Sequence, residues 1–252
     1  MKELLFLIPP SETKDSENLR DDTLTNVFDS LSFPTLNFLR KEIIDEIYNF
    51  NSYSDNLLSK IFEVKPKSVP GVLEYYADFK NAGIKNVMDV YKGTMFKSIL
   101  YSSFDEKSKN YFDSHFIIFS ALYGILKPFD EIAVYKLKPE SELKKIGKLY
   151  KFWHSEITKF LNDFSSKYII IDLLTTSYRK MYDIKKVKTL KVNFYENNKS
   201  SLKNIGHFSK DPRGILINKI CTESLTSVED FKKITDFDFD YSGGSELKVI
   251  LK

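Results

Sequence analysis

Residues 120–137 read Ser-Ala-Leu-Tyr-Gly-Ile-Leu-Lys-Pro-Phe-Asp-Glu-Ile-Ala-Val-Tyr-Lys-Leu, and no other stretch says as much about the fold. The apolar run 115–119 precedes it and is typical of a buried strand. The chain then turns at Gly124 and at Lys127-Pro128, and a second strand is predicted over 131–137. A buried strand that opens into a polar loop is how α/β folds present groups at a site. The alternative is an ordinary loop with Asp130 as a turn residue.

Apolar periodicity outside this stretch divides the chain into a helical and a mixed region. The run 4–8 predicts a buried first strand that Pro9-Pro10 ends. Apolar residues at helical spacing predict several helices between residues 34 and 100. Further strands are predicted at 115–119, 131–137, 168–173, 187–194, 203–208, 237–241 and 246–251, with the clearest helix at 149–164. We therefore expect an α+β (mixed α/β) fold, one domain over 1–252, whose mixed central sheet carries an inserted helical subdomain at about 33–103.

Composition indicates a folded protein without a strong charge bias. Hydrophobic residues make up 42% of the 252 residues, and the formal net charge is +3. This charge does not require a polyanionic partner, so a basic surface would need an uneven distribution of lysine and arginine. Arginine occurs only at positions 20, 40, 179 and 213. Each arginine is therefore informative, because its planar fork matches phosphate better than lysine does.

Several classes of protein are disfavoured by what the sequence lacks. The single Cys221 excludes an intrachain disulfide, fits a reducing compartment and is predicted to be a small core residue. No apolar run reaches the roughly 18 residues of a membrane span, so we expect a cytoplasmic protein without a membrane partner. The three histidines are isolated from one another, and neither a Cys pair nor an HExxH motif is present. We expect no dedicated metal site and no cofactor.

The segment 209–214, Ser-Lys-Asp-Pro-Arg-Gly, is typical of a helix start. Asp211 is predicted as the N-cap and Pro212 as the first helical residue. Free N–H groups at a helix N-terminus, joined by Lys210 and Arg213, would form a phosphate site. The alternative is a helix cap whose basic side chains are only solvated.

Six blocks together resemble the peroxide stress protein YaaA family. They are ALYGILKPFDEIAVYKL at 121–137, PPSETK at 9–14, YKGTMF at 91–96, LYKFW at 149–153 with IT and LN following, IDL at 171–173 with Tyr178, and KDPRG at 210–214. The resemblance implies a role in the oxidative-stress response and in keeping free iron low. This chain departs from the family pattern at Ala121, where relatives can have Gly, and at Lys127 and Lys136, where Arg is more usual. The two lysines keep the charge but lose bidentate phosphate geometry.

The first functional hypothesis is a protein that binds double-stranded DNA with low sequence specificity and helps limit damage from free iron. DNA would be held mainly through its phosphates, and binding would weaken steeply with salt. The predicted phosphate contacts are Lys14, Lys92, Lys127, Lys136, Lys210 and Arg213. Tyr123 and Tyr135 are predicted to pack against sugar or base.

The second hypothesis is an enzyme that acts on a small phosphorylated or nucleotide-like substrate in an enclosed pocket. Tyr135 or Ser120 would then transfer protons, and Asp130 or Asp172 would orient them. The mild net charge favours this hypothesis. A third is a stress-linked protein that acts through a protein partner. The sequence favours DNA binding and leaves catalysis open.

Overall fold

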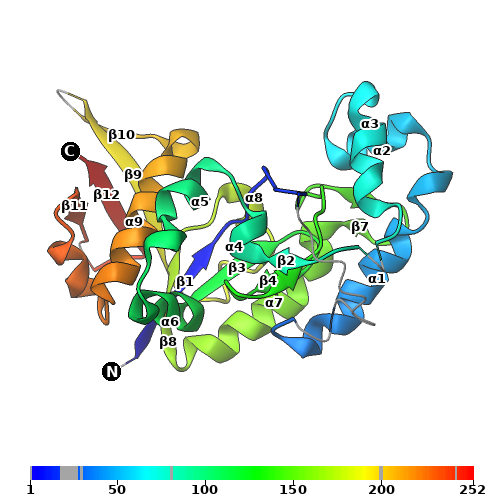
Figure 1. The fold of residues 1–252 in the computed structure, drawn as a ribbon. Helices are drawn as coiled ribbons and strands as arrows, with labels where there is room; N and C mark the ends of the chain where they lie inside the picture. Colours follow the sequence, from blue (N-terminus) through cyan, green and yellow to red (C-terminus); the bar gives the residue numbers. More distant parts are fainter. Residues whose placement is uncertain (1, 18–27, 29–30, 80–81, 199–200, 242) are drawn as a thin grey trace.

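A computed structural model describes residues 2–17, 28, 31–79, 82–198, 201–241 and 243–252, and a mixed sheet forms its centre (Figure 1). The parallel strands are β12 (Glu246–Leu251), β9 (Thr189–Asn198), β8 (Tyr168–Asp172), β1 (Glu3–Ile8) and β3 (Phe116–Ser120), in that spatial order. The antiparallel strands are β11 (Phe237–Asp240) beside β12, β4 (Gly124–Leu126) beside β3, and β10 (Ser201–Asn204) beside β9. The α+β prediction with a mixed central sheet is confirmed.

The central strands are apolar because the sheet is covered by helices. Phe6 of β1 pairs in register with Phe116 of β3, and their rings stack with centroids 4.7 Å apart. The helix α7 (Leu149–Ser165) packs on β8 and β4, and α6 (Glu106–His115) packs on β1 and on α9 (Lys210–Glu223). Near-continuous hydrophobic runs are what such buried parallel strands require. No helix in the described part of the chain is long and apolar enough to cross a membrane.

The region predicted as a helical subdomain contributes to two places in the fold. The helices α1 (Asn37–Ile47), α2 (Asp55–Phe62) and α3 (Val69–Leu73) stand together at one side, near the small β6 (Glu142–Leu143) and β7 (Gly147–Lys148) hairpin (Figure 1). The short α4 (Val87–Val90) follows them, and α5 (Thr94–Ile99) packs against α9. Whether this region is a separate unit of folding stays a prediction.

The structure corrects three local predictions. The strand expected over 131–137 is only β5 (Glu131–Ile132), which pairs with β2 (Lys85–Asn86). Beyond it, the N–H of Ala133 donates to the Tyr123 hydroxyl at 3.1 Å and the N–H of Lys136 donates to the Tyr76 hydroxyl at 2.7 Å. Side-chain hydroxyls therefore satisfy backbone groups that a neighbouring strand would otherwise pair.

The other two corrections concern the approach to α9. The strand expected over 203–208 ends at Asn204 and is followed by a 3₁₀ helix (Gly206–Ser209). The N-cap of α9 is Ser209 and not Asp211, which lies in the first turn and accepts a hydrogen bond from Ser98. The helix thus begins two residues earlier than the proline signal indicates, because the preceding 3₁₀ turn leads directly into it.

The loop after β3 is held by a buried arginine. The guanidinium of Arg40, 0% exposed, donates to the carbonyls of Tyr123 and Ile125, each at 3.0 Å. Asp130 accepts the Lys127 N–H at 2.9 Å, so its interpretation as a turn residue is confirmed. Gly124 has φ +76°, and a Cβ there would lie 2.8 Å from the Trp153 ring. Glycine is therefore required at this turn, and Trp153 is a core residue as its helical stripe indicates.

Candidate functional site

A small cleft lies where β1 and β8 end. Its volume is about 140 Å³, and four segments far apart in sequence line it. They are the loop 9–13 after β1, residues 93–96 at the start of α5, Thr175 and Tyr178 after β8, and Lys210 and Arg213 at the start of α9. The carboxyl edge of parallel strands is where open α/β sheets bind ligands. Larger hollows exist in the described structure, but this cleft brings four of the six sequence blocks together.

The loop after β1 is fastened to the chain before α5. The Ser11 hydroxyl donates to the Thr13 carbonyl at 2.6 Å and accepts the Gly93 N–H at 2.8 Å. The Lys92 N–H donates to the same Thr13 carbonyl at 3.0 Å. A Cβ at position 93 would lie 2.5 Å from the Ser11 hydroxyl oxygen, so glycine is needed there. These bonds set one wall of the cleft.

Arg213 is a buried cation with little to balance it. Its side chain is 7% exposed, and its Nη2 donates to the Ser209 hydroxyl at 2.9 Å. Its Nε has no hydrogen-bond partner among the described residues. Burial and the nearby Arg179 lower the pKa of Arg213 to about 10, while Asp172 opposes them. The Cζ of Arg213 also lies 5.5 Å from the centre of the Phe194 ring. Because a buried guanidinium whose Nε has no acceptor is costly, the cleft favours an anionic ligand.

The carboxylate that acts on Arg213, that of Asp172, is already used by another arginine. The Nε of Arg179 lies 2.5 Å from a carboxylate oxygen of Asp172 at the end of β8. Asp172 also accepts the Tyr182 hydroxyl at 3.0 Å and the Leu174 N–H at 2.7 Å. Its carboxylate is therefore satisfied without Arg213.

Lys14 lies beside the cleft on the faces of two tyrosines. Its Nζ is 4.2 Å from the centre of the Tyr135 ring and 5.5 Å from that of Tyr91. It donates to the Ser11 carbonyl at 2.8 Å. Burial, and then the charge of Lys136, lower the pKa of Lys14 to about 7, and Glu12 partly opposes them. Lys14 can thus change its charge near neutral pH.

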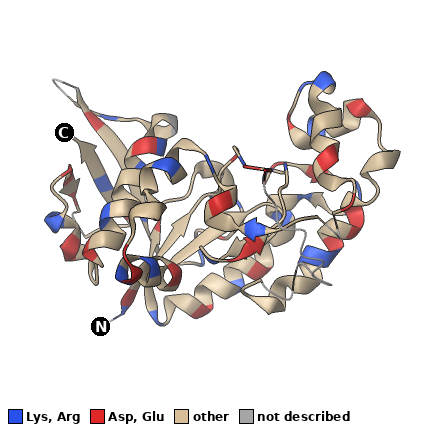
Figure 2. Ribbon diagram, viewed as in Figure 1, with Lys and Arg blue, Asp and Glu red and all other residues tan. Residues whose placement is uncertain are grey.

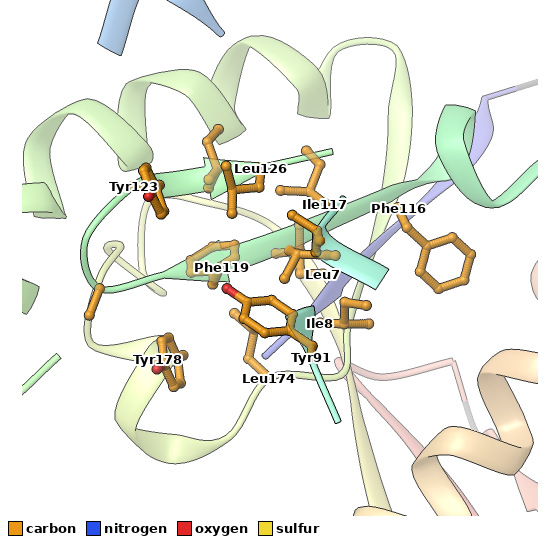
Figure 3. Packing of buried hydrophobic residues seen from close by; sticks show 14 of the residues in the cluster. Leu7, Ile8, Tyr91, Phe116, Ile117, Phe119, Tyr123, Leu126, Leu174 and Tyr178 are labelled. Carbon is orange, nitrogen blue, oxygen red and sulfur yellow. The ribbon is translucent and has the colours of Figure 1, made fainter. Parts of the chain in front are cut away.

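A chain of hydroxyl groups lies beneath Lys14. Ser120 at the end of β3 donates to the Tyr135 hydroxyl at 2.8 Å, and the Tyr135 and Tyr91 hydroxyls are 3.0 Å apart. Figure 3 shows the Tyr91 ring among apolar side chains of β1 and β3. Burial raises the pKa of Tyr135 to about 12, so its hydroxyl is neutral at physiological pH.

The acids expected to orient Ser120 and Tyr135 bind elsewhere. Asp130 accepts bonds from Ser32 and Lys127, and Asp172 accepts bonds from Arg179 and its neighbours. The orienting role predicted for these two acids is therefore wrong. Position in the sequence does not show which way a carboxylate points. In the fold, the turn at Lys127 orients Asp130, and the ion pair with Arg179 orients Asp172.

The structure places the predicted contact residues in different surroundings. Lys210 is exposed in the cleft wall, whereas Lys92 and Lys136 are half-buried. Lys92 directly precedes Gly93 of the cleft, and the charge of Lys136 acts on Lys14. The Lys127 Nζ donates to the carbonyls of Asp113 and Ser114, at 2.6 and 3.1 Å, near the end of α6. Tyr123 is 0% exposed and bonds to Ala133 through its hydroxyl. In this structure Lys127 and Tyr123 therefore shape the loop after β3 and do not line the cleft.

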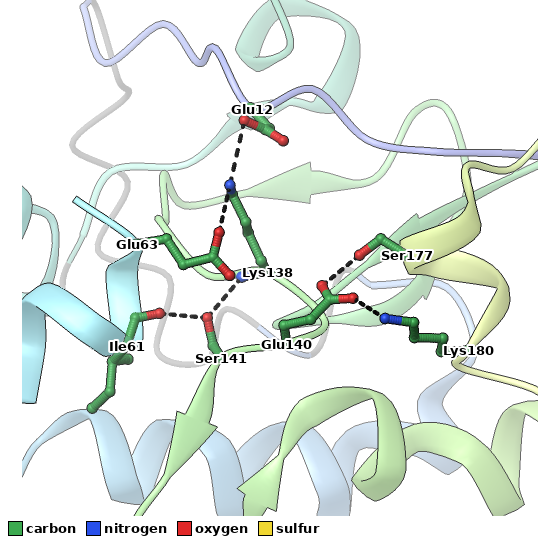
Figure 4. A network of polar contacts seen from close by, with 8 residues as sticks. All are labelled: Glu12, Ile61, Glu63, Lys138, Glu140, Ser141, Ser177 and Lys180. Carbon is green, nitrogen blue, oxygen red and sulfur yellow. Dashed lines mark hydrogen bonds and ion pairs between the residues drawn. The ribbon is translucent and has the colours of Figure 1, made fainter. Parts of the chain in front are cut away.

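Acidic residues lie on the side of the cleft that faces α2. Lys138 lies 2.8 Å from Glu63 and 3.8 Å from Glu12, and it joins the end of α2 to the loop after β1 (Figure 4). Glu140 accepts bonds from Ser177 of α8 (Thr176–Arg179) at 2.5 Å and from Lys180 at 2.7 Å. Lys210 and Arg213, by contrast, line the cleft from α9.

Sequence reasoning did not select Gly93 or the Arg179–Asp172 pair as parts of the site. The scarcity of arginine marks position 179, but its partner is known only from the fold. As for metals, the described residues contain no group of three or more His, Cys, Asp or Glu that could hold an ion.

All the segments that line the cleft lie within the region of the chain that matches known proteins. A family model described as "Peroxide stress protein YaaA" matches residues 4–244. A UPF0246 protein from Rickettsia felis is 30% identical over 246 residues, which are 95% of this chain and 94% of that relative. A UPF0246 protein from Francisella tularensis subsp. novicida is 26% identical over 250 residues, 95% of each chain. One from Rickettsia bellii is 30% identical over 202 residues, 78% of this chain and 81% of that relative.

Proposed function

This chain belongs to the peroxide stress protein YaaA family, and we propose that it serves the response to hydrogen peroxide by binding DNA through its phosphates. The observation that carries the proposal is Arg213, a buried guanidinium in the wall of a cleft with an unpaired Nε. Guanidinium–phosphate hydrogen bonds are among the strongest that proteins form. A phosphate in the cleft would supply a negative charge to balance the guanidinium of Arg213 and an acceptor for its Nε.

The other basic residues extend the proposed contact. Lys210, which lines the same cleft, would share the phosphate with Arg213. Lys14, Lys92 and Lys136 would meet neighbouring phosphates. Lys127, Tyr123 and Tyr135 would act by supporting the loop after β3. Phosphate contacts carry no sequence information, so we expect duplex binding with low specificity.

We also propose that the protein acts in the cytoplasm, since its single cysteine fits a reducing compartment. Protein bound along a duplex would shield the backbone from the damage that iron and peroxide cause together. Such shielding would protect DNA against damage from free iron without a dedicated metal site.

The test is fluorescence anisotropy with a labelled duplex at several salt concentrations. Lys210→Ala/Arg213→Ala is compared with Lys151→Ala/Lys159→Ala, which removes two exposed lysines of α7. We expect salt-sensitive binding that the first pair of substitutions abolishes and the second preserves. Absence of duplex binding by the unmodified protein at low salt would overturn the proposal.

A second candidate function is the binding of a small phosphorylated substrate. The volume of about 140 Å³ favours it, because this space suits a phosphate group with a small attached group. Glycerol 3-phosphate serves as a probe in a thermal-shift measurement with the same two double variants. Stabilisation that depends on Lys210 and Arg213, without duplex binding, would select this function over DNA binding.

A further inference from the structure

We propose that Lys14 forms a reversible imine with an aldehyde whose neighbouring phosphate is held by Arg213 and Lys210. The inference deepens the proposed function and rests on it for the phosphate. It assigns a chemical class of substrate to the cleft, an aldehyde next to a phosphate. The groups that carry it are the amine of Lys14, the cations of α9 in the cleft wall, and the loop 9–13 that lines the same cleft beside the amine.

The position of Lys14 is the first argument. Its Nζ lies over the faces of Tyr135 and Tyr91 and donates to a carbonyl oxygen, that of Ser11. The carboxylate of Glu12, in the cleft wall, lies 3.8 Å from the Nζ of Lys138. Within the described structure, no ion pair joins Lys14 to a carboxylate. The rings and the carbonyl hold the amine in place, and burial without a paired carboxylate favours loss of its proton.

The protonation state is the second argument. A lysine must be neutral to attack a carbonyl carbon, and an ordinary lysine is neutral in only about one molecule in 2,500 at pH 7. Burial and the charge of Lys136 bring the pKa of Lys14 to about 7. A large share of the molecules therefore carries a free amine at physiological pH.

The neighbourhood of Lys14 is the third argument. Ser11 and Thr13 line the cleft, and the Lys14 amine bonds to the Ser11 carbonyl in the same short loop. Arg213 and Lys210 form another part of that wall. Lys14 is half-buried and directly follows Thr13 of the cleft wall, so a ligand anchored through its phosphate would present its adjacent carbon to this loop and raise the effective concentration of the reacting groups.

The step balances without an oxidant or a reductant. The nitrogen lone pair of Lys14 forms a bond to the aldehyde carbon while the carbon–oxygen π bond breaks. Both amine hydrogens leave with the former carbonyl oxygen as one water molecule, and a carbon–nitrogen double bond remains. Hydrolysis reverses the step.

Two sources carry this chemistry. One is an abasic deoxyribose in DNA, whose ring opens to an aldehyde between two phosphates. The other is a free sugar phosphate such as glyceraldehyde 3-phosphate. The arms of the experiment use one probe of each kind.

The test is trapping with sodium borohydride, which reduces an imine to a stable amine. The protein is incubated with a duplex that contains one abasic site, or with glyceraldehyde 3-phosphate, and the adduct is measured by intact mass. Lys14→Arg keeps the charge but cannot form the imine. Lys144→Arg is the matched control, because the Lys144 Nζ also lies over a tyrosine ring, 3.8 Å from the centre of Tyr53, on an exposed residue.

We expect an adduct with the unmodified protein and with Lys144→Arg, and its loss in Lys14→Arg. Peptide mapping of the unmodified protein locates the modified lysine directly, so the result does not depend on how well the variant folds. An adduct at other lysines, or none with either probe, would overturn the inference. Binding to an intact duplex is measured in parallel. Duplex binding without an adduct rejects the imine alone, and a Lys14 adduct with the sugar phosphate without duplex binding rejects the DNA proposal alone.

Discussion

At the scale of single residues, two buried arginines differ in what balances them. Arg40 donates to the carbonyls of Tyr123, Ile125 and Ser32 and to the side chain of Asn37. Arg213 has a side-chain bond to Ser209 and an Nε without a partner among the described residues. Arg40 is therefore part of the framework of the loop after β3, whereas Arg213 is available to a ligand.

This difference predicts opposite effects on stability. Arg213→Met should raise the free energy of unfolding by about 1 kcal/mol, because it removes a poorly compensated buried charge and keeps much of the volume. Arg40→Met should lower it by about 3 kcal/mol, because buried carbonyls lose their donor. Urea denaturation measures both. Equal losses in the two variants would show that Arg213 is as well balanced as Arg40.

Lys14 makes stability depend on pH in a direction that can be worked out. Its pKa falls from 10.5 to about 7 in the folded protein, so between these values the unfolded state binds more protons. Stability then rises with pH through this interval, and below pH about 7 the cost of burying the ammonium is complete. The advantage of Lys14→Met over the unmodified protein should therefore be larger at pH 6 than at pH 9. A pH-independent difference in urea denaturation would refute this assignment.

At the scale of elements, the cleft depends on the close approach of α5 and α9. A Cβ at Gly214 would lie 2.3 Å from the Met95 carbonyl oxygen and 2.6 Å from the Ser98 Cβ. The backbones can meet only because position 214 has no side chain. Since Arg213 and residues 93–96 line the cleft from these two helices, their spacing sets its width.

Gly214→Ala should force the two helices apart. We expect a loss of about 2 kcal/mol in the free energy of unfolding, together with weaker duplex binding. Gly71→Ala is the control, because nothing lies within 4 Å of a Cβ there and α3 contains the residue. It should be neutral or stabilise by up to about 1 kcal/mol. Denaturation midpoints and anisotropy report the two effects, and an unchanged Gly214→Ala protein would contradict the packing argument.

At the scale of the whole molecule, charge is mixed over the surface. Basic and acidic residues are interspersed on the helices, the central strands carry few of either, and the net charge is +3 (Figure 2). Long-range attraction of DNA should therefore be modest, and binding should depend on a few local phosphate contacts.

The salt dependence of binding tests this view. If Lys14, Lys92, Lys136, Lys210 and Arg213 each neutralise one phosphate, the logarithm of the affinity should fall against the logarithm of salt with a slope of about −4 to −5. Arg213→Met should reduce that slope by about one unit. A slope near −8 would mean that a much wider surface binds DNA than the cleft proposed above.

Much of the framework followed from the sequence because its signals are local. The apolar runs that become β1 and β8, the stripe of α7 and the turn at Gly124 depend on neighbours along the chain. The cations Lys14, Lys210 and Arg213 could also be selected in advance, because they stand at the ends of predicted elements. The segment 133–137 could not, since distant tyrosine hydroxyls replace the strand partner that its alternation suggests.

What the tertiary structure alone decided is how these groups are balanced. The sequence determined which cations exist and which strand or helix ends present them. It did not determine that Arg40 is fully bonded while Arg213 is not, or that Asp172 pairs with Arg179. Nor did it indicate that Lys14 lies over two buried tyrosines. These properties depend on burial and on partners distant in sequence, and both exist only once the sheet has brought the separate segments to one edge.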